Sequence, residues 1–311
     1  MDPVIEIAGL CKDFRTGFWR RRVRVLHALD LVVHQGEIFG YLGPNGAVKT
    51  TTLKLLTGLI LPTAGAARLL GRYLMEVAAK QRIGFLPENP YFYDYLTGRE
   101  FLDFCGRLFG LSASLRRDRI ARLLQLTKME GAAHLQLRKY SKGMLQRLGL
   151  AQALVNDPDL VILDDPMSGL DPLGRKAMRD IILQLKAEGR TIFFSSHILP
   201  DVEVLCDRVA ILVAGRLQDV GRLDQILKNE TESIELTLQH VSAELLRSLQ
   251  GFTQTPILEQ ADGVLIRLPD EHRLDMALRM ALAAGARVIL VSPQRVTLES
   301  HFLREVQGAA R

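Results

Sequence analysis

Residues 43–51 read Gly-Pro-Asn-Gly-Ala-Val-Lys-Thr-Thr, and this glycine-rich segment constrains the fold more than any other stretch of the chain. The apolar run before it, residues 38–42, predicts a short buried strand, and residues 53–56 have helical apolar spacing. A strand, a glycine-rich turn and a helix in this order are the setting of a phosphate-binding loop. In such a loop, backbone N–H groups converge on one point and the helix N-terminus attracts anions.

Two side chains of the loop have the chemistry that nucleoside phosphates require. We predict that Lys49 places its positive charge beside the outer phosphates and that Thr50 binds the Mg²⁺ ion that bridges them. The whole loop is therefore a predicted nucleotide site. Its residues are Gly43, Pro44, Asn45, Gly46, Ala47, Val48, Lys49, Thr50 and Thr51.

Val48 departs from the standard pattern Gly-x-x-x-x-Gly-Lys-[Ser/Thr], in which a second glycine stands at this position. That glycine lets the backbone approach the phosphates without an intervening side chain. Valine is β-branched and stiff, and it disfavours unusual φ values. We therefore expect Val48 to weaken nucleotide binding at the loop.

The composition is that of a globular protein with a mildly basic balance. The chain has 311 residues, of which 48% are hydrophobic, and its formal net charge is +5, so there is length for one large and one small domain. Three cysteines far apart indicate a reducing compartment rather than a disulfide framework or a zinc site. We expect no signal peptide. No apolar run reaches the roughly 18 residues of a membrane helix, so a membrane span is expected from another chain.

Residues 1–225 have the pattern of an α/β domain, because apolar runs that predict strands alternate with helical segments. The runs at residues 159–163 and 191–194 are continuous, as in parallel strands buried on both faces. Between about residues 88 and 150 the pattern becomes helical and interrupts this alternation. We therefore predict a helical subdomain inserted into a parallel-sheet domain.

Residues 232–311 follow a different order, in which a strand, a helix, a hairpin, a second helix and a last strand succeed one another. This β-α-β-β-α-β order is that of a small α+β ferredoxin-like domain. A terminal helix is predicted over residues 298–306. The expected segments are 234–238, 243–249, 256–258, 264–266, 272–284 and 288–291.

Polar side chains follow the two buried strands of the first domain. Asp164 and Asp165 end the apolar run at residues 159–163, and His197 follows the run at residues 191–194. Open α/β sheets bind their ligands at the carboxyl ends of the strands. We therefore predict that these three side chains lie at the nucleotide site.

Ser141 and Gly143 stand just before a second predicted helix, over residues 145–154. A serine and a glycine in this place leave free N–H donors at the helix N-terminus. The segment is therefore a second candidate anion site.

Taken in order, these segments resemble the nucleotide-binding subunit of an ABC transporter over roughly the first 225 residues. Residues 161–172, VILDDPMSGLDP, resemble the Walker B and D-loop run. Residues 140–144, YSKGM, resemble the ABC signature in a form similar to that of type-2 exporters. The segment 83–88, with Glu88 at the Q-loop position, also resembles that branch of the family. The resemblance implies a P-loop NTPase fold, the ABC cassette, that binds ATP and Mg²⁺.

The resemblance also implies a role for each matching residue of the chain's own site. Phe14 is the aromatic residue expected to stack on adenine, with an ordinary core phenylalanine as the alternative. Asp164 is expected to hold Mg²⁺ together with Thr50, and Glu88 to lie near the metal. His197 is expected to contact the γ-phosphate, with an ordinary surface or core histidine as the alternative.

Other matching residues are implied to serve the site of a second subunit. Ser141 and Gly143 would reach across a dimer interface to the γ-phosphate that the partner holds, and Asp171 belongs to the D-loop. The implied partners are therefore transmembrane permease subunits and a second ATP-binding subunit, identical or different. We expect no nucleic acid. The implied location is cytoplasmic, on the inner face of the cell membrane, with membrane contact through the partner.

Asp165 is a second departure, because the family has a glutamate there that polarises the attacking water. Aspartate is one methylene shorter, so its carboxylate falls short by roughly 1.3–1.5 Å. A misplacement of about 1 Å costs on the order of 100-fold in rate. Val48 and Asp165 belong to the same composite site, so we expect weakened hydrolysis there.

Three functions remain open at this point. The first is an ATP-hydrolysing subunit that energises export through separate transmembrane subunits. The second is a weakly hydrolysing or non-hydrolysing partner in an asymmetric complex, which Val48 and Asp165 favour. The third is a soluble ABC ATPase acting on nucleic acid or the ribosome, which ranks last because the chain has one cassette and no sustained heptads.

Overall fold

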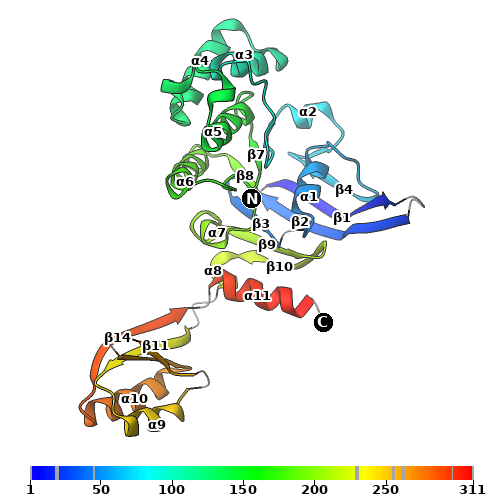
Figure 1. Ribbon diagram of the computed structural model, residues 1–311. Helices are drawn as coiled ribbons and strands as arrows, with labels where there is room; N and C mark the ends of the chain where they lie inside the picture. Colours follow the sequence, from blue (N-terminus) through cyan, green and yellow to red (C-terminus); the bar gives the residue numbers. More distant parts are fainter. Residues whose placement is uncertain are drawn as a thin grey trace. The chain divides into compact units, whose positions relative to one another are not determined.

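The computed structural model describes residues 2–17, 21–44, 46–227, 231–253, 256–260, 263–295 and 297–309. The chain forms two compact units, one of Met1–Leu223 with Glu305–Arg311 and one of Asp224–Arg304 (Figure 1). Within the described ranges, no helix has the length and apolar character that crossing a membrane requires.

The first unit is built on a six-stranded sheet with the order β10-β9-β3-β8-β7-β6. All neighbouring strands are parallel except the β9–β10 pair. Every residue of β3 and β7 is buried, as the continuous apolar runs predicted. The strands are β3 (Ile38–Leu42), β6 (Ile83–Leu86), β7 (Leu160–Asp164), β8 (Thr191–Ser196), β9 (Arg208–Val213) and β10 (Arg216–Arg222).

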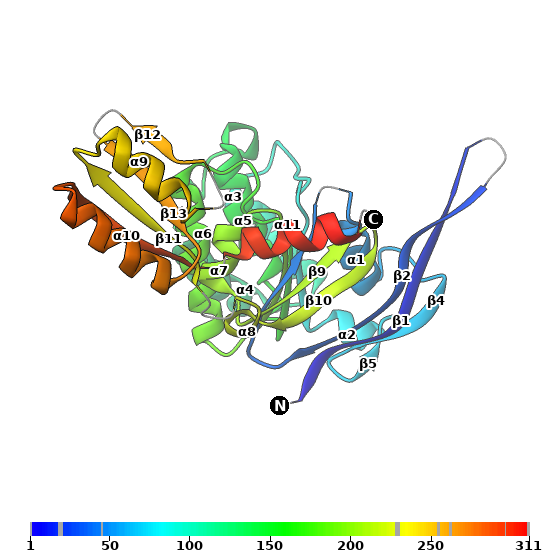
Figure 2. The ribbon, with the colours of Figure 1, turned by 90° about the horizontal axis from the view of Figure 1, so that it is seen from below.

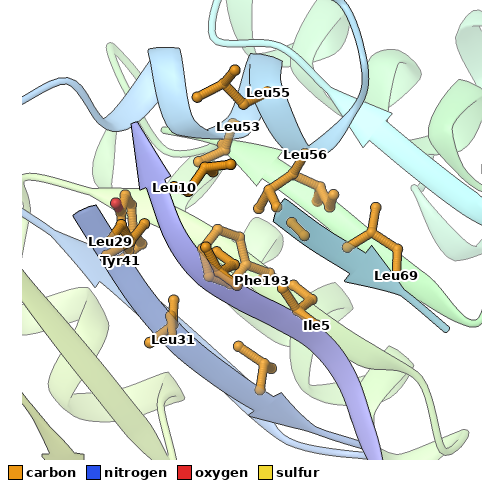
Figure 3. Packing of buried hydrophobic residues seen from close by; sticks show 14 of the residues in the cluster. Ile5, Leu10, Leu29, Leu31, Tyr41, Leu53, Leu55, Leu56, Leu69 and Phe193 are labelled. Carbon is orange, nitrogen blue, oxygen red and sulfur yellow. The ribbon is translucent and has the colours of Figure 1, made fainter. Parts of the chain in front are cut away.

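A smaller antiparallel sheet of the order β2-β1-β4-β5 packs against this sheet together with helix α1 (Lys49–Leu56). Figure 3 shows Ile5 of β1, Leu53 of α1 and Phe193 of β8 meeting in the common core. This packing fixes the start of α1, and hence the phosphate loop, against the central strands. The strands of the smaller sheet are β1 (Pro3–Thr16), β2 (Arg21–His34), β4 (Ala64–Leu69) and β5 (Arg72–Tyr73).

The remaining helices of the first unit include a helical segment between β6 and β7, in the place where the sequence predicts an insertion (Figure 1). Its first helix begins with a capping box, in which Thr97 and Glu100 bond each other's backbone N–H groups. The segment consists of α3 (Gly98–Leu108), α4 (Ala113–Leu126), the 3-10 turns Glu130–Ala132 and Leu137–Lys139, and α5 (Lys142–Ala153). The other helices are α2 (Val77–Lys80), α6 (Pro172–Ala187) and α7 (Leu199–Leu205).

Helix α5 corrects one detail of the sequence analysis. It begins at Lys142, three residues before the predicted start, and Ser141 is its N-cap. The Ser141 hydroxyl accepts a hydrogen bond from the Met144 N–H at 3.3 Å, and Gly143 lies in the first helical turn. The predicted boundary was wrong because Lys and Gly carry no apolar signal that marks a helix start.

The second unit has the element order β-α-β-β-α-β and an antiparallel sheet of the order β12-β13-β11-β14, which is the ferredoxin-like arrangement that the sequence predicts. Its core joins Leu236 and Ile266 of the sheet to Leu249 and Ala277 of the helices. Residues 261–262 of the predicted hairpin turn lie outside the described residues. The elements are β11 (Thr231–Gln239), α9 (Ala243–Gln250), β12 (Leu258–Gln260), β13 (Gly263–Leu268), α10 (Glu271–Ala283) and β14 (Arg287–Arg295).

Two further helices complete the chain, α8 (Leu223–Ile226) and α11 (Leu298–Ala309). The predicted terminal helix over residues 298–306 corresponds to α11. Figure 2 shows the elements of both units from a second direction.

Candidate functional site

A cavity of about 570 Å³ opens at the carboxyl ends of the parallel strands of the six-stranded sheet. The loop after β3, Asp164 at the end of β7 with Asp165 just after it, and the histidine after β8 all contribute to its wall, as expected for an open α/β sheet. The lining residues are Val25, Gly46, Ala47, Val48, Lys49, Thr50, Thr51, Glu88, Asp164, Asp165, Ser168 and His197.

The phosphate loop has the strained residue that its sequence suggested. Val48 has φ 74° and ψ 19°, the left-handed conformation that glycine adopts without cost and a β-branched residue disfavours. Its backbone nonetheless starts α1, because the Val48 carbonyl accepts the Thr52 N–H at 3.1 Å. The loop thus keeps the backbone course that glycine would allow, with a valine side chain added at the cavity wall. Asn45, a predicted binding residue, lies outside the described residues.

Lys49 is buried and turns back onto its own loop. Its Nζ donates hydrogen bonds to the carbonyl oxygens of Gly43 at 2.5 Å and Pro44 at 3.2 Å. Burial lowers the pKa of the Lys49 ammonium, while the negative charges of the acids in the cavity act in the opposite direction. The ammonium group is therefore positioned over the loop, next to the cavity.

Thr50 and Asp164 both line the cavity with oxygen atoms. The Thr50 hydroxyl donates to Asp164 Oδ1 at 3.2 Å, and the hydroxyl of Ser195 donates to the same oxygen at 2.8 Å. Ser195 belongs to β8 and pairs directly with Asp164 of β7. An alcohol oxygen and a carboxylate oxygen side by side are the hard oxygen ligands that Mg²⁺ prefers.

Asp165 lies beside His197, with His197 Nδ1 and Asp165 Oδ2 2.5 Å apart. The other carboxylate oxygen, Oδ1, is buried and has no hydrogen-bond partner in the part of the chain that the structure describes. Burial raises the pKa of Asp165, and the neighbouring His197 opposes this rise. Asp165 therefore has one oxygen engaged by His197 and one oxygen that has no partner among the described residues.

Glu88 is held in the cavity wall through its backbone. The amide Nε2 of Gln146 donates to the Glu88 carbonyl oxygen at 3.2 Å. Gln146 is on α5, the helix that Ser141 caps, so this bond joins the signature segment to the loop after β6. Nothing in the sequence analysis marked Gln146, because one buried glutamine on a helix carries no motif by itself.

Phe14 is not among the residues that line the cavity. Its side chain is 37% exposed, and the Lys12 ammonium lies 5.1 Å from its ring centroid. From the same hairpin, Val25 of β2 lines the cavity instead. Stacking of Phe14 on adenine stays a prediction. Val25 and Ser168 are cavity residues that the sequence analysis did not single out.

Ser141, Gly143 and Asp171 lie apart from this cavity, along a second one of about 500 Å³ that they line with residues of α5 and α6. Asp171 is the N-cap of α6, and its Oδ1 accepts the Gly174 N–H at 2.8 Å. The sequence-predicted residues therefore form two groups, one around the phosphate loop and one around the start of α5.

The first cavity fits a nucleoside triphosphate with a magnesium ion. Its volume lies within the roughly 300–1,000 Å³ of small-molecule sites. A lysine ammonium and the start of α1 provide positive charge for phosphates, and Thr50 with Asp164 provides oxygen ligands for the metal.

Comparisons with known proteins agree with this geometry. The family model described as ABC transporter matches residues 26–168. The uncharacterized ABC transporter ATP-binding protein all4389 of Nostoc sp. is 47% identical over 307 residues, covering 98% of this chain and 90% of the relative. The chain belongs to the ABC transporter ATP-binding protein family. The bacitracin transport ATP-binding protein BcrA of Bacillus licheniformis is 34% identical, over 90% of this ABC protein and 92% of the relative.

Solved structures support the same fold for this ABC cassette. An ATP-binding subunit of an ABC transporter matches with a TM-score of 0.64 and 33% identity, covering 72% of this chain and 91% of that one. A dimeric ATP-binding cassette in a post-hydrolysis state, bound to ADP and Pi, matches with a TM-score of 0.65 and 22% identity, over 70% of this chain and 98% of that one. The predicted family and fold are therefore confirmed, the chain is an ATP-binding subunit, and ATP hydrolysis is general in its family.

Proposed function

We propose that this ABC protein hydrolyses ATP with Mg²⁺ in its own cavity and that hydrolysis drives export through separate transmembrane subunits. The observation that carries the proposal is the convergence of Lys49, Thr50, Asp164, Asp165 and His197 on one cavity. These groups supply positive charge, metal ligands and a proton acceptor, which are the parts that phosphoryl transfer needs.

Each residue has a role that follows from its position. Thr50 and Asp164 would hold Mg²⁺, which supplies positive charge against the phosphate oxygens. Lys49 would release the loop carbonyls and bind phosphate. Asp165 Oδ1, which is buried without a partner among the described residues, would accept a proton from water. His197 holds the other oxygen of Asp165 and keeps the carboxylate oriented.

We propose that two subunits act together as a dimer. Ser141, Gly143 and Asp171 line a cavity separate from the one around Lys49, so they are not positioned to serve the chain's own nucleotide. In a two-fold dimer, a contact that one subunit makes with its partner is repeated by the partner, so each signature segment would face the phosphate loop of the other subunit. The dimeric cassette in the post-hydrolysis state supports a dimer for this fold.

The export direction rests on relatives. BcrA is named for bacitracin transport, and a Nod factor export ATP-binding protein I of Cupriavidus pinatubonensis is 38% identical over 240 residues, 76% of this chain and 73% of the relative. We propose that this subunit likewise lies on the cytoplasmic face of a membrane, bound to permease chains. These relatives favour a transporter over a nucleic-acid or ribosome ATPase.

A second candidate is a weakly hydrolysing subunit that completes the active site of a different partner. Three features favour it: the left-handed Val48, the Lys49 ammonium bonded to the loop carbonyls, and the short carboxylate of Asp165 drawn toward His197. In that case the phosphate loop of the partner, together with Ser141 and Gly143 of this chain, would form the efficient site.

The test is steady-state ATP hydrolysis by the purified chain with Mg²⁺, in the presence and absence of its permease chains. We expect turnover below about one per second, slow beside the median of about 10 per second for enzymes, and loss of turnover in Lys49→Ala. Lys54→Ala is a matched control, because Lys54 is an exposed lysine of the same helix. A rate that Lys49→Ala leaves unchanged would refute hydrolysis at this cavity.

A further inference from the structure

One buried hydroxyl connects the two acids at the end of β7. The Ser195 Oγ donates to Asp164 Oδ1 at 2.8 Å and accepts the Asp165 N–H at 3.0 Å. A serine hydroxyl has one proton to donate and lone pairs to accept, so a single side chain can make both bonds at once. Ser195 is fully buried and does not line the cavity.

The backbone at Asp165 needs such support. Asp165 is the first residue after β7 and has φ 46°, a left-handed conformation that residues other than glycine rarely adopt. The paired ladder of β7 and β8 ends at Asp164 and Ser195, so the bond to the Ser195 hydroxyl holds the Asp165 N–H just beyond the ladder. Strained backbone of this kind persists where the surroundings fix it.

Two residues near the end of β8 therefore hold Asp165, each at a different group. Ser195 binds its backbone N–H, and His197 binds its carboxylate at 2.5 Å. Ser195 is the last residue of β8 that pairs with β7, and His197 is the first residue after β8. The same hydroxyl of Ser195 fixes Asp164 Oδ1, to which Thr50 also donates.

We propose that Ser195 is a positioning residue for ATP hydrolysis, which sets the metal-holding carboxylate of Asp164 and the backbone of Asp165 in one fixed relation. The inference rests on the proposed function, because it assigns the two acids to metal binding and to proton acceptance. Ser195 acts through them and touches neither nucleotide nor metal.

Such support matters for an aspartate at position 165. The reach of a short carboxylate depends on the course of its backbone, because it has one rotatable bond fewer than glutamate. The hydroxyl of Ser195 holds the backbone N–H of Asp165, and His197 holds its carboxylate. Without the Ser195 hydroxyl, the Asp165 N–H would lose this hydrogen-bond acceptor. Asp164 Oδ1 would keep the hydrogen bond from Thr50 and lose the one from Ser195.

The test compares Ser195→Ala with Ser196→Ala in the full chain. Ser196 is the neighbouring residue of the same strand, it is 1% exposed, and its hydroxyl accepts the Ile198 N–H at 3.0 Å instead of contacting the acids. Both variants remove one buried hydroxyl from β8. Ser195→Cys keeps the shape of the side chain with a somewhat larger atom and weakens both hydrogen bonds, so it serves if Ser195→Ala does not fold.

Two readouts are measured, and only the first requires turnover. In Ser195→Ala we expect kcat to fall by about 10- to 100-fold with KM for ATP nearly unchanged, as for a reacting group misplaced by a fraction of 1 Å. We also expect the Mg²⁺ concentration that half-saturates binding of a fluorescent, non-hydrolysable ATP analogue to rise about 10-fold, as for a lost outer-shell partner of a metal ligand. Binding of the analogue without Mg²⁺ should not change.

Equal behaviour of Ser195→Ala and Ser196→Ala in both readouts would overturn the proposal. So would an equal loss of analogue binding with and without Mg²⁺, because that indicates general disruption of the cavity. If the wild-type chain shows no turnover that depends on Lys49, the proposed function fails. The Mg²⁺ readout then still decides whether Ser195 positions Asp164.

Discussion

His197 Nδ1 and Asp165 Oδ2 lie 2.5 Å apart, at the ends of two adjacent parallel strands. This pair joins the residue expected to sense the γ-phosphate to the residue expected to accept the proton of the attacking water. One oxygen of Asp165 is engaged by the histidine, and the other is buried without a partner in the described residues. The pair orients a carboxylate that is one methylene shorter than the glutamate of the family pattern.

Asp165→Glu should raise the turnover of ATP at this chain's own site. The added methylene extends the reach of the carboxylate by roughly 1.3–1.5 Å. Correcting a misplacement of about 1 Å can raise the rate on the order of 100-fold. We expect an increase of at least about 10-fold in kcat, because the longer side chain must also keep its place beside His197. The measurement is steady-state hydrolysis with Mg²⁺. A rate for Asp165→Glu as low as that for Asp165→Asn would contradict the assigned role.

Asp165→Asn should stabilise the nucleotide-free, metal-free chain while abolishing turnover. Burial raises the pKa of Asp165 in the folded state, so the folded state binds the proton more tightly than the unfolded state. The free energy of unfolding therefore falls as the pH rises from the unfolded pKa, about 3.9, through the higher folded pKa. Asparagine does not titrate, so Asp165→Asn does not lose this free energy of unfolding. Its stability relative to the wild type is therefore greatest above the folded pKa of Asp165.

The measurement is Tm as a function of pH for the wild type and for Asp165→Asn. We expect Asp165→Asn to have the higher Tm at pH 7, and the difference in Tm to shrink as the pH falls toward 4. Asp180→Asn, a change at an exposed residue of α6, should leave Tm within about 1 °C. If the Tm difference between Asp165→Asn and the wild type grew on acidification, the pKa of Asp165 would not be raised in the folded state.

Val48→Gly should make the phosphate loop both more stable and more receptive to ATP. A left-handed residue other than glycine costs about 1–2 kcal/mol, and part of that gain is offset because glycine has more freedom in the unfolded chain. We expect a net gain of roughly 0.5–1 kcal/mol in the free energy of unfolding. ATP affinity should also rise several-fold, because the valine side chain no longer lines the cavity.

Lys128→Gly is the matched control for Val48→Gly. Lys128 follows α4 with φ 55°, it is exposed, and it lies outside the cavity. Glycine is favoured at such a position after a helix, so this change should also stabilise the chain. It should leave ATP affinity unaltered. If the two glycine variants change ATP affinity equally, then Val48 has no particular effect on the site.

Two inactive variants should restore activity when they are mixed, if each active site combines two subunits. Lys49→Ala disables the phosphate loop of its own subunit, and Ser141→Arg disables the signature that faces the partner. A dimer with one copy of each keeps one intact composite site, so an equal mixture should recover about a quarter of the wild-type rate. The measurement is hydrolysis after mixing and re-association of the two purified variants. Activity in either pure variant, or none in the mixture, would contradict the composite site.

The sequence predicted the parts of the fold whose signals are local. Continuous apolar runs marked the buried parallel strands, and acids after the run at residues 159–163 marked the floor of the cavity. The change of pattern near residue 232 marked the ferredoxin-like elements. The strand predictions succeeded because parallel strands buried on both faces need apolar residues throughout.

Other features required the folded chain. Ser195 is an ordinary residue of a strand until the register of β7 and β8 places it opposite Asp164. Val25 reaches the cavity from β2 of the smaller sheet, and Gln146 reaches the Glu88 carbonyl across the helical segment. No spacing rule connects such pairs, because tertiary packing alone decides which strand ends and loops meet.

The conformation of Val48 reflects both the local preference of valine and the packing of the fold. The sequence indicated that valine disfavours unusual φ values, and the structure places Val48 at φ 74° all the same. The packing of α1 against the central strands fixes the start of that helix, and the local preference of one residue is too small to move it. Tertiary structure thus overrides local propensity at the residue that most affects the loop.

The most direct test of ATP binding in this cavity is equilibrium binding of ATP with Mg²⁺ to the purified chain, beside Lys49→Ala and Lys54→Ala. We predict binding by the wild type and by Lys54→Ala, and a loss of at least about 10-fold in Lys49→Ala, because a charge-assisted hydrogen bond to phosphate is worth about 1.5–3 kcal/mol. Equal binding by all three proteins, or by none of them, would contradict the claim that ATP binds in the cavity formed by this chain's own phosphate loop.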